Sequence, residues 1–183
     1  SNSRHILVDF PHQLARAALF LNKSFPNAKI LSIHDEDSLN KFFDEEYINN
    51  IDFLLLTTDI YPNFSDLAFI KGIQIDLITN FYSLGEMPKV FFKSYMDSKL
   101  LRNAKNIYFC NRYDSSPFYE KTFEESYSLL DYLVEDFKIT LNRSSGIHNY
   151  MMPIRKYNGR TKSRPISSGY FELIQTNSRK NKS

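Results

Sequence analysis

Residues 73–89 read IQIDLITNFYSLGEMPK. The isoleucine- and leucine-rich start is typical of a strand, and we expect one from Ile75 to Asn80. The pattern from Pro88 to about Lys99 predicts a helix, because proline suits the first turn of a helix. Between the two lie an amide, a hydroxyl, a glycine and a carboxylate. This strand–turn–helix stretch indicates the fold class and contains the main candidate site.

Further apolar runs predict strands, and helical patterns separate them. Strands are expected at 5–10, 28–33, 51–57 and 106–111, helices at 11–25, 35–47 and from the capping box 122–125 to Phe137, and a turn at 59–63. Such alternation indicates a parallel sheet covered by helices, so the predicted class is α/β with a Rossmann-like, mostly parallel sheet. Two later runs, 137–141 and 170–175, predict an antiparallel hairpin at the C-terminal edge of the sheet.

The composition describes a globular chain. It has 183 residues, 42% of them hydrophobic and 15% aromatic, which excludes general disorder and fits one domain over 1–183. The single cysteine, Cys110, cannot form an intramolecular disulfide, so a cytoplasmic setting is favoured. No apolar run approaches the roughly 20 residues that a membrane-spanning helix needs.

Charge is concentrated near the C-terminus. Residues 155–183 contain eight Lys or Arg and one acid, a net +7, against −5 for the rest. We expect a basic loop at 142–169 and a disordered tail at 176–183. This segment could meet a phosphate-bearing ligand, nucleic acid or a membrane surface, although a solvated loop is the simpler interpretation.

In open α/β sheets, ligands bind beyond the carboxyl ends of the strands. The positions at these ends are Asp9 and Phe10, then Thr57, Thr58 and Asp59, then Asn80 to Glu86, then Asn111, Arg112 and Tyr113. They are the candidate site residues before any motif is considered.

Two of these stretches resemble a known family. Residues 76–88, DLITNFYSLGEMP, and 107–113, IYFCNRY, resemble the sugar O-methyltransferases of bacterial surface-polysaccharide gene clusters, which have a similar strand and an Asn-x-x-Ser-x-x-Glu-Met-Pro turn. Residues 8–11, VDFP, look like the family's segment after its glycine-rich region. The resemblance covers roughly residues 5–115, and its specific motif is the Ser-x-x-Glu-Met-Pro turn.

The resemblance implies a class I methyltransferase fold that uses S-adenosylmethionine. Asp9 then stands where an acid holds the ribose hydroxyls of the cofactor, a charge-assisted arrangement. The alternative is that Asp9 caps the helix that begins at Pro11. Thr57 and Thr58 would face the adenine or be ordinary strand-end hydroxyls, and Phe10 and Asn80 complete the implied cofactor-binding set.

The acceptor would be a sugar, presented as a sugar nucleotide or a lipid-linked glycan. Glu86 is the candidate base for the sugar hydroxyl, and His148 on the basic loop is the second. The alternative for Glu86 is a capping box with Ser83 for the following helix. The implied substrate-binding residues are Ser83, Asn111, Arg112 and Tyr113.

One departure from the family concerns glycine. The chain has five glycines, at 72, 85, 146, 159 and 169, and none are close enough to form the glycine-rich cofactor turn. We therefore expect either a piece that starts at the family's second strand, with which the opening Ser-Asn-Ser is consistent, or an inactive relative. In both cases the chain alone should bind S-adenosylmethionine poorly.

Two non-enzymatic alternatives remain. A receiver-like signalling or interaction module would use Asp59 after the 51–57 strand, but the acids and lysine that it needs are not in place. A nucleic-acid binder would use residues 155–164 with Tyr150 and Tyr157 as stacking groups. Nucleic acid is the less favoured partner, and no spacing of His, Asp or Glu indicates a metal site.

Overall fold

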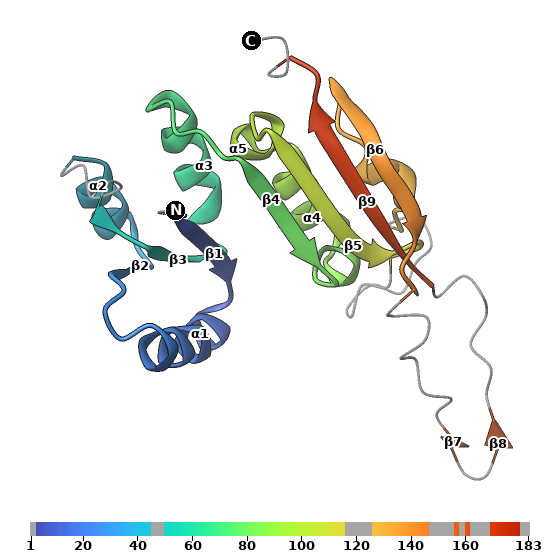
Figure 1. Cartoon of the computed structure of the whole chain (residues 1–183), viewed down its shortest axis with the longest axis horizontal. Helices are drawn as coiled ribbons and strands as arrows, with labels where there is room; N and C mark the ends of the chain where they lie inside the picture. The colour runs from blue at the N-terminus through green and yellow to red at the C-terminus, as the bar shows by residue number, and fades with distance from the viewer. Residues whose placement is uncertain are drawn as a thin grey trace. The chain divides into compact units, whose positions relative to one another are not determined.

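The structure is a computed structural model and describes residues 3–44, 50–115, 126–146, 156–157, 160–161 and 169–179. The chain divides into two compact units, Ser1–Gly72 and Ile73–Ser183 (Figure 1). Each unit contains its own sheet. None of the described helices has the length and apolar composition required to cross a membrane.

Unit 1 contains a parallel sheet of three strands in the order β1-β3-β2. The strands are β1 (His5–Asp9), β2 (Ile30–Ile33) and β3 (Phe53–Thr57). They alternate with α1 (Pro11–Ser24), α2 (Glu36–Asp44) and α3 (Tyr61–Ile70). β3 lies in the centre and is almost wholly buried, as its continuous apolar run predicts.

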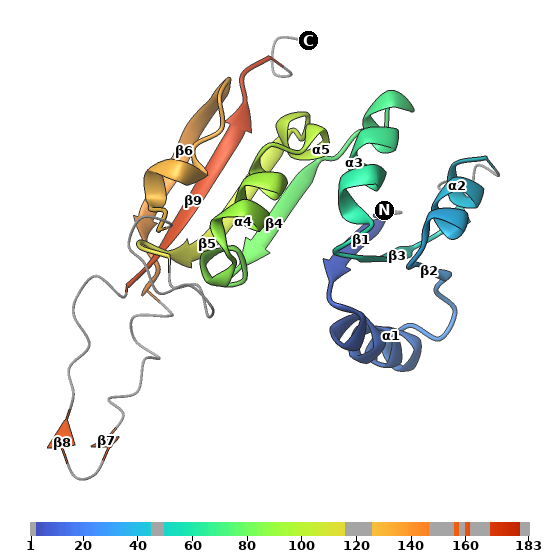
Figure 2. The ribbon, with the colours of Figure 1, turned by 180° about the vertical axis from the view of Figure 1, so that it is seen from behind.

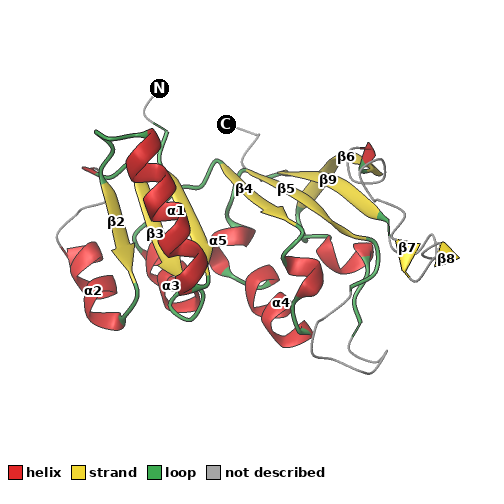
Figure 3. Cartoon of the chain, turned by 90° about the horizontal axis from the view of Figure 1, so that it is seen from below, coloured by secondary structure: helices red, strands yellow, loops and turns green. Residues whose placement is uncertain are grey.

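Helices cover both faces of the unit 1 sheet (Figure 3). On one face, Leu14 and Leu21 of α1 pack with Leu55 of β3. Leu54 and Leu56 point to the opposite face, because side chains alternate along a strand, and both are fully buried. The α2 and α3 helices lie on that second face (Figure 3).

Helix α3 corrects the sequence analysis, which expected a turn at 59–63. The helix begins at Tyr61 with a proline in its first turn. Its buried residues, Tyr61, Phe64, Ser65 and Ala68, recur at helical spacing and could have predicted it. Helix α2 is described to Asp44, and the remainder of the helix expected at 35–47 lies outside the described residues.

Unit 2 contains a sheet of four strands in the order β4-β5-β9-β6. The strands are β4 (Leu77–Phe81), β5 (Asn106–Arg112), β6 (Phe137–Ser144) and β9 (Tyr170–Asn177). β4 and β5 are parallel, whereas β9 is antiparallel to both β5 and β6, which confirms the C-terminal hairpin and the α/β class. β6 extends into the segment assigned to the basic loop, and β9 extends into the expected tail.

The described helices of unit 2 pack against one face of this sheet (Figure 2). They are the α-helices α4 (Lys89–Met96) and α5 (Lys99–Arg102) and the 3₁₀ turns η2 (Leu84–Glu86) and η4 (Leu129–Tyr132). With Ile107, Phe109, Phe171 and Leu173 from the strands they form one core. Two short strands, β7 (Lys156–Tyr157) and β8 (Arg160–Thr161), pair with each other.

The sequence predicted a helix from the capping box at 122–125 to Phe137. This prediction is wrong for the described part of that segment. The capping box is instead formed by Ser128 and Asp131, and it begins a single 3₁₀ turn. Leu130 of the supposed apolar stripe is 73% exposed, and Phe137 begins β6. Residues 122–125 themselves lie outside the described residues.

A buried glutamine accounts for the end of this turn. The Gln175 side chain on β9 accepts from the Val134 backbone N–H at 2.9 Å and donates to the Tyr132 carbonyl at 2.8 Å. These bonds satisfy backbone groups that a longer helix would pair internally. Residues 132–134 are therefore fixed on the sheet by a side chain that lies far away in the sequence.

Candidate functional site

Polar residues after β4 and β5 meet at one edge of the unit 2 sheet. The strands are parallel and Phe81 is in register with Cys110, so the residues that follow lie side by side. The start of β9 reaches the same edge, where Tyr170 pairs with Arg112. Of the predicted site residues, this edge holds Asn80, Ser83, Glu86, Asn111, Arg112 and Tyr113.

Two asparagine side chains hold the turn after β4. Asn111 is fully buried, and its Oδ1 accepts from the Gly85 backbone N–H at 3.1 Å. Its Nδ2 donates to Asn80 Oδ1 at 3.0 Å, which also accepts from the Leu84 N–H at 3.1 Å. Asn80 Nδ2 donates to Ser83 Oγ at 2.7 Å. Both amides therefore bond to the turn itself.

The backbone of the turn contains a residue in the left-handed region. Tyr82 has φ 65°, a conformation that costs a non-glycine residue about 1 kcal/mol or more. Its N–H donates to the Cys110 carbonyl at 2.8 Å, which fixes this conformation against β5. The left-handed residue reverses the chain immediately after β4.

A buried tyrosine holds the turn from the core side. The Tyr127 hydroxyl donates to the carbonyls of Leu84 and Met87, the second at 2.7 Å. Its ring stacks on Phe92 of α4 with centroids 4.0 Å apart. The turn and the helix after it are thus attached to the same aromatic core.

The capping-box alternative for Ser83 and Glu86 is wrong. The Ser83 side chain makes no capping hydrogen bond and accepts from Asn80 instead. The Glu86 N–H donates to the main-chain carbonyl of Ser83 at 3.1 Å. Helix α4 begins at Lys89 after Pro88, so Glu86 has no capping role there.

Glu86 instead faces Arg112. The Arg112 Nη2 lies 3.2 Å from Glu86 Oε1, and the two side chains are 17% and 30% exposed. The guanidinium carbon lies 5.4 Å from the centre of the Tyr170 ring, a cation–π contact. Arg112 Nε is buried without a hydrogen-bond partner in the described part of the chain. The sequence analysis did not single out Tyr170, because only the β5–β9 register brings it here.

Tyrosine hydroxyls surround this edge. The Tyr113 hydroxyl lies 2.9 Å from Ser144 Oγ at the end of β6. Burial raises the pKa of Tyr82 and of Tyr108, and it raises the pKa of Tyr132 far above its ordinary value. These three hydroxyls therefore stay protonated and neutral at neutral pH.

The other predicted cofactor residues belong to unit 1. Asp9 is in register with Thr57 at the carboxyl ends of β1 and β3. Asp9 is exposed, and its Oδ1 accepts from the Phe10 N–H at 2.7 Å. Phe10 is the N-cap residue of α1, and no side chain makes a capping hydrogen bond there. The alternative that Asp9 caps this helix is therefore wrong. Thr58 is half-buried.

Among the described residues, the remaining acids form no further centre. The nearby Thr57 side chain lowers the pKa of Asp59, although the Thr57 hydroxyl makes no hydrogen bond in the described part of the chain. Asp35 caps the start of α2 by accepting from the Ser38 N–H at 2.8 Å. Within the described ranges, no three His, Cys, Asp or Glu side chains form a metal-binding group. His148 lies outside the described residues.

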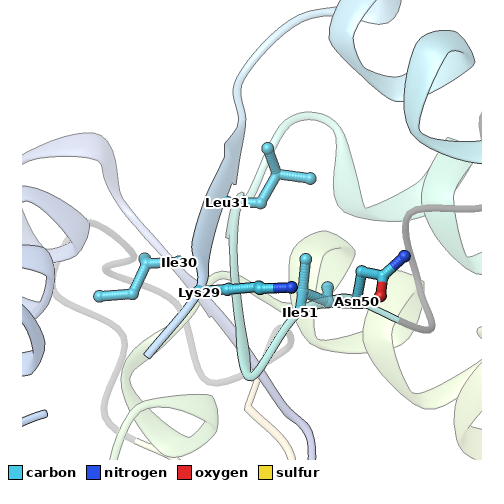
Figure 4. Close-up of a pocket in the computed structure, with 5 residues that line it drawn as sticks. All are labelled: Lys29, Ile30, Leu31, Asn50 and Ile51. Carbon is cyan, nitrogen blue, oxygen red and sulfur yellow. The ribbon is translucent and has the colours of Figure 1, made fainter. Parts of the chain in front are cut away.

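An open hollow on unit 1 lies away from these positions (Figure 4). It is lined by Lys29, Ile30, Leu31, Asn50 and Ile51. These residues stand at the amino-terminal ends of β2 and β3, opposite the ends that carry the candidate residues. The hollow is therefore not part of the predicted site.

Comparisons with known proteins give a distant likeness to solved structures. No protein-family model matches the chain, and no curated protein matches it. Among solved structures, a LepI variant in complex with SAH and a substrate analogue matches with a TM-score of 0.36 and 9% identity. The match covers 95% of this chain and 43% of that one, so this chain spans less than half of its length. No conclusion about activity follows from a likeness of this size.

Proposed function

We propose that the chain is the acceptor-side part of an S-adenosylmethionine-dependent methyltransferase that acts on a sugar hydroxyl in surface-polysaccharide biosynthesis, in the cytoplasm. It would work within a longer enzyme, or be an inactive relative of one. The observation that carries the proposal is the turn between β4 and α4. Its amide network and Tyr127 hold it at the carboxyl edge of the sheet, with the Glu86 carboxylate beside Arg112.

The reaction requires a positioned hydroxyl and a proton acceptor. The sugar oxygen attacks the methyl carbon, the new C–O bond forms as the C–S bond breaks, and the hydroxyl proton passes to a base. When bound, S-adenosylmethionine supplies the electrophilic methyl group. Glu86 is the proposed base, a role worth roughly 10²–10⁴-fold in rate. His148 is the second candidate for that role.

We propose cofactor-binding residues in unit 1 and acceptor-binding residues in unit 2, each within its own unit. Asp9 uses one carboxylate oxygen for the Phe10 N–H, so the other is available for ribose hydroxyls. Phe10 is 54% exposed and, with Thr57 and Thr58, would border the adenine. In the proposed site, Asn80, Ser83 and Asn111 shape the turn, while Arg112 and Tyr113 would contact the acceptor sugar.

Methyl transfer by the protein as its gene encodes it tests the proposal. Tritiated S-adenosylmethionine and a panel of sugar nucleotides should give labelled sugar, and Glu86→Gln should lower kcat at least about 100-fold. Glu135→Gln, the same change at an exposed position, is the matched control. A protein that neither binds the cofactor nor labels any sugar would overturn the proposed activity and leave only the inactive relative, and an unaffected Glu86→Gln would remove Glu86 as the base.

Calorimetry tests whether this chain by itself binds S-adenosylmethionine. Because the chain lacks a glycine-rich turn, we expect no binding of S-adenosylmethionine in the micromolar range. Micromolar binding would show that the chain carries a complete cofactor site by another route.

A further inference from the structure

The second face of the unit 2 sheet carries an aromatic strip. Side chains alternate along β5, so Ile107 and Phe109 face the helices while Tyr108, Cys110 and Arg112 point to the other face. Figure 1 shows this second face, and no described helix of unit 2 lies on it. On this face Phe81 is exposed, Tyr82 and Tyr108 are half-buried, and Tyr170 is 4% exposed. The exposed aromatic ring and its half-buried neighbours are a surface that a ligand can use.

The rings form a connected row. The Phe81 centroid lies 5.3 Å from that of Tyr108 and 6.4 Å from that of Tyr82. Tyr82 meets Tyr170 edge-on at 5.2 Å, and Arg112 lies over the Tyr170 ring. Phe81 is 53% exposed, so the row has one open ring face and ends at the Glu86–Arg112 pair. We call Phe81, Tyr82, Tyr108 and Tyr170 the aromatic strip.

Among the described residues, two ion pairs lie beside the aromatic strip and their charges cancel. Arg112 is paired with Glu86, and Arg143 is paired with Glu172 at 2.7 Å. Glu172 is in register with Cys110, so this second pair lies next to Tyr108 on the same face. Two guanidinium groups and two carboxylates give no net charge. A polyanion such as nucleic acid needs an excess of cations, which these paired side chains do not provide.

We propose that the accessible part of the aromatic strip, Phe81 with Tyr82 and Tyr108 beside it, binds a sugar ring of a neutral glycan. The C–H faces of a pyranose are apolar and slightly positive, and they suit the negative faces of aromatic rings. The paired guanidinium and carboxylate groups at the two sides offer donors and acceptors to sugar hydroxyls. This inference rests on the proposed sugar methyltransferase function and specifies its acceptor, a glycan without charged groups.

Binding to this chain tests the inference without any methyl transfer. The probes are neutral glucose, galactose and rhamnose trisaccharides, followed by saturation-transfer NMR and by tyrosine fluorescence, which is usable because the chain has no tryptophan. At least one neutral trisaccharide should bind, and Phe81→Ala should weaken it at least fivefold. Phe81→Leu should weaken it similarly, because leucine keeps the bulk and removes the ring.

The matched control is Phe91→Ala on α4. Phe91 is 58% exposed, close to the value for Phe81, but it lies on the helix layer. It should leave binding unchanged. Binding of no neutral trisaccharide, equal losses in the Phe81 and Phe91 variants, or tighter binding of a glucuronate trimer or of oligo-dT would each overturn the inference. Neutral glycan binding by a protein that transfers no methyl group would support the aromatic strip and count against the proposed enzyme.

Discussion

Two neighbouring core tyrosines should respond in opposite ways to the loss of the hydroxyl. Tyr127 and Tyr132 are 3% and 1% exposed and belong to the same core. The Tyr127 hydroxyl donates to the carbonyls of Leu84 and Met87, whereas the Tyr132 hydroxyl has no partner in the described part of the chain. Tyr127→Phe and Tyr132→Phe therefore make the same chemical change, but only Tyr127→Phe breaks a hydrogen bond.

The expected magnitudes follow from hydrogen-bond energetics. Loss of the Tyr127 donor should lower the free energy of unfolding by about 1–1.5 kcal/mol, because it removes a net favourable bond. A buried hydroxyl without a partner costs about 1–3 kcal/mol of desolvation, so Tyr132→Phe should be neutral or raise stability by up to about 1 kcal/mol. The two variants should differ by roughly 2 kcal/mol, close to 30-fold in the unfolding equilibrium.

Urea unfolding followed by far-UV circular dichroism measures this difference. With a slope of about 1.5 kcal/mol/M, the midpoints of the two variants should lie roughly 1 M apart. Hydrogen exchange of the β5 amides reports whether the change occurs in unit 2. Equal destabilisation by both changes, or a greater loss in Tyr132→Phe, would refute the assignment of the hydrogen bonds.

Three other outcomes are expected. Asn111→Ala leaves the buried Gly85 N–H unpaired and removes one of the two bonds to Asn80 Oδ1, so it should lower the free energy of unfolding by about 2–4 kcal/mol, measured in urea, against little change for exposed Asn142→Ala. Arg143→Met should cost about 1–2 kcal/mol by leaving the Glu172 carboxylate buried, and adding Glu172→Gln should recover much of it in a double-mutant cycle. Above pH 10 Tyr132 ionises in the unfolded chain, whereas its raised pKa keeps it neutral in the fold. The free energy of unfolding should therefore fall as the pH rises. In Tyr132→Phe this fall should be less steep, by up to about 1.4 kcal/mol per pH unit, as measured by unfolding at several pH values.

The sequence predicted the elements that depend on short-range patterns of apolar and polar residues. The strand that ends near Asn80, the turn after it and the C-terminal hairpin follow from apolar runs and from the residues that interrupt them. Helix α3 was missed because Pro62 and Asn63 were interpreted as a turn, although the buried positions recur at helical spacing.

Long-range contacts decided the places where prediction failed. The stripe ending at Phe137 has helical spacing, yet Gln175 takes the backbone groups of Tyr132 and Val134 and the chain continues as a strand. Ser83 and Glu86 have the spacing of a capping box, but their side chains bond to Asn80 and Arg112. Gln175 and Arg112 are distant in the sequence from the groups that they bind, whereas Asn80 lies three residues from Ser83.

The sequence by itself determined that a polar turn follows β4 and that Asn111 and Arg112 follow a later strand. Only the tertiary structure decided what these residues do. The parallel pairing of β4 and β5 brings the buried Asn111 to the half-buried Asn80, 31 residues away, and both amides hydrogen-bond to the turn. The same pairing leaves Glu86 beside Arg112 and Phe81 on the open face. Residue types set the available chemistry, and strand pairing determines which groups are used within the fold.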